Sequence, residues 1–257
     1  MLKTIAIIPA RMAATRFAGK PMAPILGMPM VGHCYHRAKL AQGIDAVYVA
    51  TCDEEIANYI KKIGGNAVMT SDHHKRATTR TAEALEIIEE ETGLHYDIVV
   101  MVQGDEPLIN PDVIGATLVP FEDESVEIVN IMSRLDTLEA FSDKNNVKVV
   151  VNQNNDAMYF SREAIPSPWH GIDGVPCYNQ TGIIAFRTDT LEEFNAMDES
   201  PLEIIESVDM NRVLEAGESI RMVLADAETF GVDTPAELKQ AERILRNDPI
   251  CKLYINL

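Results

Sequence analysis

The sequence contains little cysteine, few aromatic residues and no long hydrophobic run. Its 257 residues include four cysteines, one tryptophan and 6% aromatic residues in all. The cysteines are far apart and form no C-x-x-C pair, so we expect reduced thiols in a cytoplasmic protein. No stretch approaches 18 apolar residues, and the apolar part of the first eleven residues is too short for a secretory signal. We therefore expect no membrane partner.

Positive charge is scarce and unevenly distributed. The chain has 22 Lys and Arg against 40 Asp and Glu, which gives a net charge of −18. This excess of acid argues against a nucleic-acid partner. Residues 1–44, by contrast, contain six cations and no Asp or Glu. We interpret this segment as part of a site for a small anionic ligand, and the alternative is a solvated basic surface.

The composition and the order of short apolar runs predict an α/β fold. With 46% hydrophobic and 24% charged residues, the chain is typical of globular proteins. We expect a single domain spanning 1–257. Up to about residue 103, strands alternate with helices, which predicts a mostly parallel sheet in a layered sandwich. Later strands follow one another closely, so we expect a β-rich arm at about 140–190.

Periodicity and capping residues give the expected elements. The expected strands are 4–9, 45–51, 66–70, 97–103, 126–133, 146–152, 157–161, 179–186 and 219–225. The expected helices are 29–40, 53–65, 79–91, 188–196, 201–216 and 234–245. Ligands of such sheets bind at the carboxyl ends of the strands.

The segment PARMAATRFAGKP, residues 9–21, follows the first strand and carries Arg11, Arg16 and Lys20. Such a loop can turn backbone N–H groups and cationic side chains toward a polyphosphate. It is neither the ATPase P-loop, because Ala14 and Pro21 stand at required positions, nor the G-x-G-x-x-G fingerprint. Spacing alone leaves an exposed basic loop as an equal alternative.

Two acidic motifs follow later strands. VQGDEP, residues 102–107, places Asp105 where Mg²⁺ bound to phosphates would lie, although such a sequence also makes a turn. GVDTP, residues 231–235, places Asp233 at a second strand-to-helix junction, as a metal ligand or a helix-start residue. His33 and His36 have ligand spacing, but we expect both to be packing or surface residues. His73 and His74 lie in a loop that we expect close to the ligand.

Eight segments occur in one order: PARMAATRFAGKP, ATCDEEI, GGNAVMTS, VQGDEPLI, MYFSREAIP, TGIIAFR, LEIIES and GVDTPAEL. Together they resemble the cytidylyltransferases that activate 3-deoxy-manno-octulosonate (Kdo), over about residues 3–246. The resemblance implies a Rossmann-like nucleotidyltransferase sandwich with a dimerisation arm. It also implies Mg²⁺ as cofactor and a homodimer that serves lipopolysaccharide biosynthesis. The implied reaction transfers CMP from CTP to a sugar acid and releases pyrophosphate.

The resemblance also implies roles for individual residues. Lys20, Asp105 and Asp233 would be catalytic, and the two aspartates would hold Mg²⁺. The acceptor would be bound by Arg162, Gln180, Asp209 and Met210. The nucleotide would be bound by Pro9, Ala10, Arg11, Arg16, Lys20, Thr78, Arg80 and Gln103.

Several positions depart from the family pattern, mostly on the acceptor side. Ala14 and Ala18 replace Ser and Pro, and Thr79 stands where Asp is usual. Gln180 replaces a His, while Asp209 and Met210 replace Glu and Gln. Kdo is the first expectation for the acceptor. The alternatives are another acidic acceptor (amino-Kdo, a sialic-like acid or a phosphonate) and a non-catalytic nucleotide-binding homologue, against which the retained aspartates argue.

Overall fold

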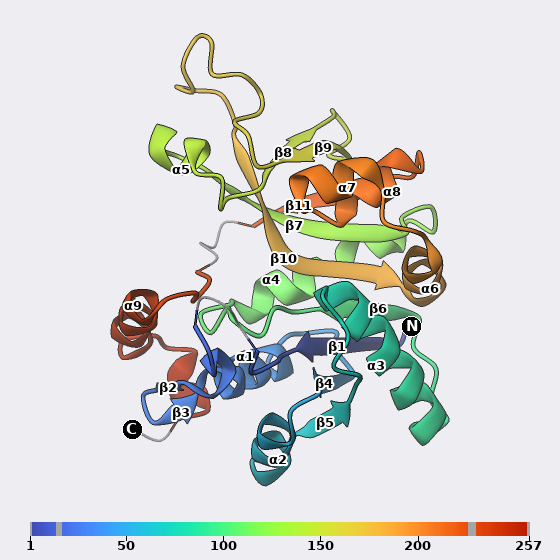
Figure 1. Cartoon of the computed structure of the whole chain (residues 1–257), viewed down its shortest axis with the longest axis vertical. Coiled ribbons are helices and arrows are strands. Elements are labelled where there is room, and N and C mark those ends of the chain that lie inside the picture. Colours follow the sequence, from blue (N-terminus) through green and yellow to red (C-terminus); the bar gives the residue numbers. More distant parts are fainter. Residues whose placement is uncertain (1, 14–16, 226–229, 256–257) are drawn as a thin grey trace. The chain divides into compact units, whose positions relative to one another are not determined.

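The structure is a computed structural model that describes residues 2–13, 17–225 and 230–255. The chain is divided into two compact units, Met1–Gly115 with Thr229–Leu257, and Ala116–Glu228. Figure 1 labels the α-helices and β-strands of both units. Among the described residues, no helix is long and apolar enough to cross a membrane. The assignment of residues 1–257 to one domain stays a prediction.

The first unit contains the parallel sheet that the alternating sequence pattern predicts. Its strands are β1 (Thr4–Pro9), β4 (Ala46–Thr51), β5 (Asn66–Met69) and β6 (Ile98–Met101). They run in the order β6-β1-β4-β5, and each neighbouring pair is parallel. All six residues of β1 are buried, as expected for a strand that is covered on both faces.

Three helices connect these strands. The chain passes through α1 (Met30–Lys39) and α2 (Glu54–Lys62) on its way from β1 through β4 to β5, and α3 (Ala77–Thr92) returns it to β6. Because parallel crossovers are right-handed, α1 and α2 lie on one face of the sheet and α3 on the other. The direction of winding reverses between β1 and β6. In open α/β sheets, ligands bind beside the carboxyl ends of the strands at such a point.

A short pair of strands and the last helix complete the first unit. β2 (Pro24–Ile25) and β3 (Met28–Pro29) are antiparallel, although the sequence predicts only loop there. The helix α9 (Pro235–Leu245) contacts β2. The chain also has η1 (Lys20–Met22), α4 (Pro111–Ala116) and η3 (Cys251–Leu253). The core between β2, α1 and α9 consists of Ile25, Met30, Val232, Ala241, Leu245 and Cys251.

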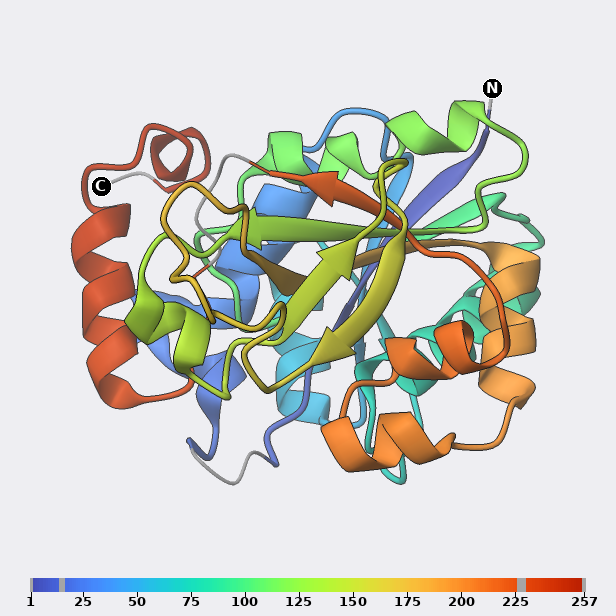
Figure 2. The ribbon, with the colours of Figure 1, turned by 90° about the horizontal axis from the view of Figure 1, so that it is seen from above.

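The second unit is rich in β-strands. Strand β7 (Ile128–Arg134) pairs antiparallel with β10 (Tyr178–Arg187) and parallel with β11 (Arg221–Leu224). β8 (Lys148–Val151) and β9 (Ala157–Ser161) form an antiparallel pair (Figure 2). β8 also pairs with the start of β10. The predicted arm therefore divides: β10 belongs to the row β11-β7-β10, whereas β8 and β9 stand off it.

The helices of the second unit are short. They are η2 (Val119–Glu122), α5 (Leu138–Ser142), α6 (Thr188–Ala196), α7 (Pro201–Glu206) and α8 (Met210–Glu215). The prediction of one helix over 201–216 is wrong, because Ser207 has a left-handed backbone with φ of 54°. The break leaves the carbonyl groups of Glu206 and Ser207 outside the helix, where both accept hydrogen bonds from Arg162.

Candidate active site

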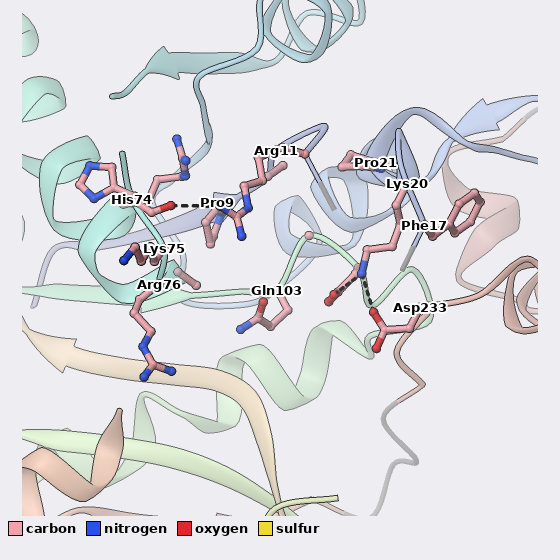
Figure 3. A pocket seen from close by; sticks show the side chains of 16 residues that line it. Pro9, Arg11, Phe17, Lys20, Pro21, His74, Lys75, Arg76, Gln103 and Asp233 are labelled. Carbon is pink, nitrogen blue, oxygen red and sulfur yellow. Dashed lines mark hydrogen bonds and ion pairs between the residues drawn. The ribbon is translucent and has the colours of Figure 1, made fainter. Parts of the chain in front are cut away.

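An open pocket of about 300 Å³ lies in the first unit at the carboxyl ends of β1 and β6. Its walls come from the loop after β1, the start of α3, the loop after β6 and the segment just before α9 (Figure 3). Its cations outnumber its carboxylates, which favours an anionic ligand. The charged residues that line it are Arg11, Lys20, Lys75, Arg76, Arg80, Asp105 and Asp233.

Lys20 lies between Asp105 and Asp233. Its Nζ donates to Oδ2 of Asp105 at 2.7 Å and to Oδ1 of Asp233 at 2.9 Å (Figure 3). Burial alone would lower the pKa of Lys20, but the two carboxylates outweigh this effect and raise it. The lysine is therefore a charged counter-ion. The structure brings together the three residues that the resemblance implies to be catalytic.

The backbone on either side of the basic loop places Lys20. The N–H of Gly19 donates to the carbonyl oxygen of Met12 at 3.1 Å and closes the loop. Gly19 has a φ of 72°, which glycine adopts without strain. The N–H of Met12 donates to Oδ2 of Asp53 at 2.8 Å, which ties the loop to the end of β4. Arg16 lies outside the described residues, so its phosphate contact stays a prediction.

Two close approaches bring the aspartates to the lysine. A Cβ on Gly104 would lie 2.8 Å from the carbonyl oxygen of Pro9, so glycine is required where the β6 loop meets the β1 loop. The N–H of Val232 donates to the carbonyl oxygen of Asp105 at 2.9 Å. This bond holds the segment that carries Asp233 against the β6 loop.

The two carboxylates fit the Mg²⁺ that the resemblance implies. They present hard oxygen ligands toward one point, where the ammonium of Lys20 lies. Among the described residues, no group of three or more His, Cys, Asp and Glu side chains is arranged to hold a metal alone. Mg²⁺ commonly takes one or two carboxylates from a protein and completes its octahedron with substrate phosphates and water. The site suits such a shared cation.

Arg80 lines the pocket and carries a buried donor atom. Its side chain is 2% exposed, and its Nη1 donates to the carbonyl oxygen of Ser71 at 3.1 Å and to Oγ1 of Thr70. Its Nη2 is buried and has no hydrogen-bond partner within the described ranges. Leaving a buried donor unpaired costs free energy. A ligand that supplies an acceptor oxygen or nitrogen at this point recovers that cost.

The other predicted nucleotide-binding residues divide into two groups. Thr78 is buried in α3 behind the pocket wall, with 1% of its surface exposed. Its contact with a nucleotide stays a prediction. The remaining residues line the pocket: Pro9, Ala10, Arg11 and Gln103.

Sequence reasoning missed part of the cationic wall. Lys75 and Arg76 come directly before the first turn of α3, and Ala77 of that turn also lines the pocket. A helix N-terminus attracts anions through its unpaired N–H groups and its dipole. Two cations before a helix that follows a parallel strand are the signal that could have found them. Of the two histidines expected close to the ligand, His74 lines the pocket, whereas His73 is not among the lining residues.

The packing role expected for His33 is confirmed. Its Nε2 contacts the carbonyl oxygen of Ile25 at 2.9 Å, and its Nδ1 contacts the hydroxyl of Tyr254 at 3.1 Å. Burial lowers the pKa of His33 to about 4, so the ring is neutral at pH 7. The four cysteines are free thiols, as predicted.

The predicted acceptor-binding residues lie in the second unit. The Nε of Arg162 donates to the carbonyl oxygen of Glu206 at 2.8 Å, and its Nη1 donates to that of Lys144 at 3.0 Å. Asp209 precedes the first turn of α8. Met210 has no exposed surface. The side chain of Met210 is therefore part of the interior, because the helix turns it inward, and its contact with the acceptor stays a prediction.

Gln180 has a fixed amide orientation. The Nδ2 of Asn130 donates to the carbonyl oxygens of Ile131, Thr181 and Ile183, so its Oδ1 is the remaining acceptor. The Nε2 of Gln180 donates to that Oδ1 at 2.7 Å. The Oε1 of Gln180 accepts no hydrogen bond from the described residues. This side chain can therefore offer a neutral acceptor to a ligand.

Comparison with known proteins places this chain among nucleotidyltransferases. A family model described as cytidylyltransferase matches residues 5–220. A 3-deoxy-manno-octulosonate cytidylyltransferase of Phocaeicola vulgatus is 40% identical over 255 residues, which cover 95% of this chain and 98% of the relative. One of Geobacter metallireducens is also 40% identical, with 95% and 99% covered. A solved CMP:2-keto-3-deoxy-manno-octonic acid synthetase complexed with CTP superposes with a TM-score of 0.87 and 34% identity, with 95% of this chain and 98% of that chain covered.

Proposed function

Because the chain belongs to the cytidylyltransferase family, we propose that it transfers CMP from CTP to Kdo and releases pyrophosphate. The relatives that carry the Kdo name match it over nearly their whole length. The observation that carries the proposal is Lys20, held between Asp105 and Asp233 in a pocket with a surplus of cations.

The chemistry of the transfer explains this arrangement. An acceptor hydroxyl oxygen loses its proton and forms a bond to the α-phosphorus of CTP, and the bond from that phosphorus to the bridging oxygen breaks, so pyrophosphate leaves. Negative charge on the triphosphate opposes the attack unless cations neutralise it. Arg11 and Lys20 lie in the pocket wall where they can do so. Arg80, with its buried Nη2, can donate to an acceptor atom of the nucleotide.

We also propose that the enzyme uses Mg²⁺, held by Asp105 and Asp233. When bound, the ion would supply positive charge to phosphate oxygens. The protein's own part is to present the two carboxylates and to keep a cationic ammonium beside them. Lys20 must then share these carboxylates with the ion or turn toward the phosphates.

The test is pyrophosphate release from CTP with a panel of acceptors: Kdo, amino-Kdo, a sialic acid and a phosphonate. We expect release with Kdo and CTP, and far less with ATP or UTP. Release with another acid in preference to Kdo would support the same reaction with that acid as the acceptor. Binding of CTP with no release from any acceptor would identify a non-catalytic homologue.

Two further proposals concern the whole protein. Its relatives' Kdo names suggest a place in lipopolysaccharide biosynthesis, and four free cysteines suit a reducing cytoplasm. We propose a homodimer formed through the β-rich arm, where Trp169 is 85% exposed. Light scattering at micromolar concentration tests this, and a monomer there would remove the claim.

A further inference from the structure

Glu83 lies on α3 and binds two residues of the loop before that helix. Its carboxylate accepts hydrogen bonds from the backbone N–H of Ser71 at 3.0 Å and from Oγ of Ser71 at 2.7 Å. The same carboxylate accepts a hydrogen bond from Nε2 of His74. The other ring nitrogen of His74, Nδ1, lies 3.0 Å from Oγ1 of Thr79. One side chain thus fixes both ends of the segment 71–74.

The backbone carbonyl groups of those two residues hold the arginines of the pocket. The carbonyl oxygen of Ser71 accepts from Nη1 of Arg80 at 3.1 Å. The carbonyl oxygen of His74 accepts from Nη1 of Arg11 at 3.2 Å (Figure 3). Both arginines line the pocket, whereas Glu83 is not among its lining residues.

The electrostatics agree with a carboxylate that is tied in place. Burial alone would raise the pKa of Glu83, but the hydrogen bonds from Ser71 and His74 outweigh burial and lower it. Glu83 is therefore ionised at pH 7 and can accept all three donors. A glutamine at this position has a single acceptor oxygen and an NH₂ group that would face a donor.

We propose that Glu83 is a positioning residue that orients Arg11 and Arg80 for the nucleotide through the carbonyl groups of His74 and Ser71. A guanidinium that is already held by a carbonyl group loses less conformational freedom when a phosphate or base binds it. The proposal rests on the proposed function only in naming CTP as the ligand.

The first experiment measures CTP affinity by calorimetry for Glu83→Gln. We expect the dissociation constant to rise by about tenfold, within the range for residues of one hydrogen-bond network. The control is Glu86→Gln on the same helix, because Glu86 is exposed and makes no hydrogen bond or ion pair with the described residues. Equal CTP affinity of folded Glu83→Gln and the control would overturn the proposal.

A double-mutant cycle separates positioning from a merely structural role. If Glu83 acts through Arg11 and Arg80, then Glu83→Gln should weaken CTP binding by less than about twofold once both arginines are alanine. If Glu83→Gln weakened CTP binding by the same factor with and without the two arginines, the proposal would be overturned. His74→Ala is the second variant, since it leaves the Ser71–Glu83 bonds intact. His74→Ala should lower the affinity for CTP when Arg11 is present and change it little in the Arg11→Ala background.

A readout without nucleotide keeps this inference distinct from the proposed function. The ¹⁵N relaxation of the Arg11 Nε–H group reports the order of its side chain in the ligand-free protein. We expect a lower order parameter in Glu83→Gln than in wild type or Glu86→Gln. If wild type bound no CTP, the proposed function would fail, while the order parameter would still decide the role of Glu83. An unchanged order parameter of Arg11 in Glu83→Gln would overturn the positioning role of Glu83.

Discussion

At the scale of single residues, the pair Asp105 and Asp233 is the sharpest test of the proposed chemistry. Asp105→Asn removes one negative charge beside Lys20 and one hard oxygen ligand. We expect turnover to fall about a hundredfold or more, the scale for a lost electrostatic stabiliser, with little change in the free energy of unfolding. Steady-state pyrophosphate release measures this. Asp112→Asn, at an exposed position of α4, is the control. Near-native turnover would show that Asp105 is not a ligand.

Lys20 gives a second prediction at this scale, about binding. Lys20→Ala leaves two carboxylates without their ammonium in the wall of an anion pocket. We expect weaker CTP binding, by about tenfold or more, and a smaller change in acceptor binding. Calorimetry with CTP and with Kdo measures both. Equal CTP affinity in the variant would mean that the loop is the solvated surface that spacing alone allowed.

Gln180 gives a prediction about the acceptor. Its Oε1 accepts no hydrogen bond from the described residues and can accept one from a ligand, while one N–H of Nε2 donates to Asn130. A carbonyl acceptor favours hydroxyl or ammonium groups and disfavours carboxylate or phosphonate oxygens. Gln180→His replaces it with a group that can donate, so the ratio of kcat/KM for amino-Kdo to that for Kdo should fall about tenfold or more. Gln153→His, at an exposed position, is the control. An unchanged ratio would show that Gln at position 180, in place of the family's His, does not affect the choice of acceptor.

At the scale of elements, the break between α7 and α8 is held by Glu206. Burial alone would raise the pKa of Glu206, but hydrogen bonds from Ser161, Arg162 and Tyr159 lower it below the ordinary value of 4.5. A depressed carboxyl pKa contributes stability that is present above pH 4.5 and lost as the pH falls through the folded-state value.

The prediction compares Glu206→Gln with wild type in urea unfolding. At pH 7 the variant should be the less stable protein, and the difference should shrink as the pH falls below about 4.5. Glu193→Gln, at an exposed position of α6, should show no such pH dependence. A constant difference between Glu206→Gln and wild type from pH 7 to pH 3 would contradict the assigned role.

Elements were predictable where a local pattern agreed with the final packing. The strand 4–9 and the helix after Thr234 have their predicted bounds, because a buried apolar run and a capping box are local signals. The β2–β3 pair and the break at Ser207 were missed. Their causes are distant in sequence: α9 contacts β2, and Arg162 binds the carbonyl groups at the break.

The candidate site was predictable to a similar extent. The resemblance gave Lys20, Asp105 and Asp233 together, and the structure brings them within hydrogen-bond distance. Glu83 could not be predicted, because its role depends on two carbonyl groups of a loop that has no periodic signal. The side chain of Met210 turns inward because α8 begins at this residue. The sequence predicted one continuous helix there and therefore did not indicate this start.

At the scale of the whole molecule, net charge and local charge oppose each other. The chain carries −18 overall, yet the pocket wall has five cations and two carboxylates. The Debye length is about 10 Å at 0.1 M salt, so distant acids are largely screened while the wall is not. The affinity for CTP should therefore fall as salt rises.

The measurement is the dissociation constant for CTP at KCl concentrations from roughly 0.05 to 0.5 M. Over this range the Debye length falls from about 14 Å to about 4 Å. We expect weaker binding at high salt, by several fold, and a smaller salt effect in Lys20→Ala. Net repulsion by the acidic protein predicts the opposite sign, tighter binding as salt screens it. The sign of the salt dependence thus decides whether the cations of the pocket or the acidic remainder of the chain govern the approach of the nucleotide.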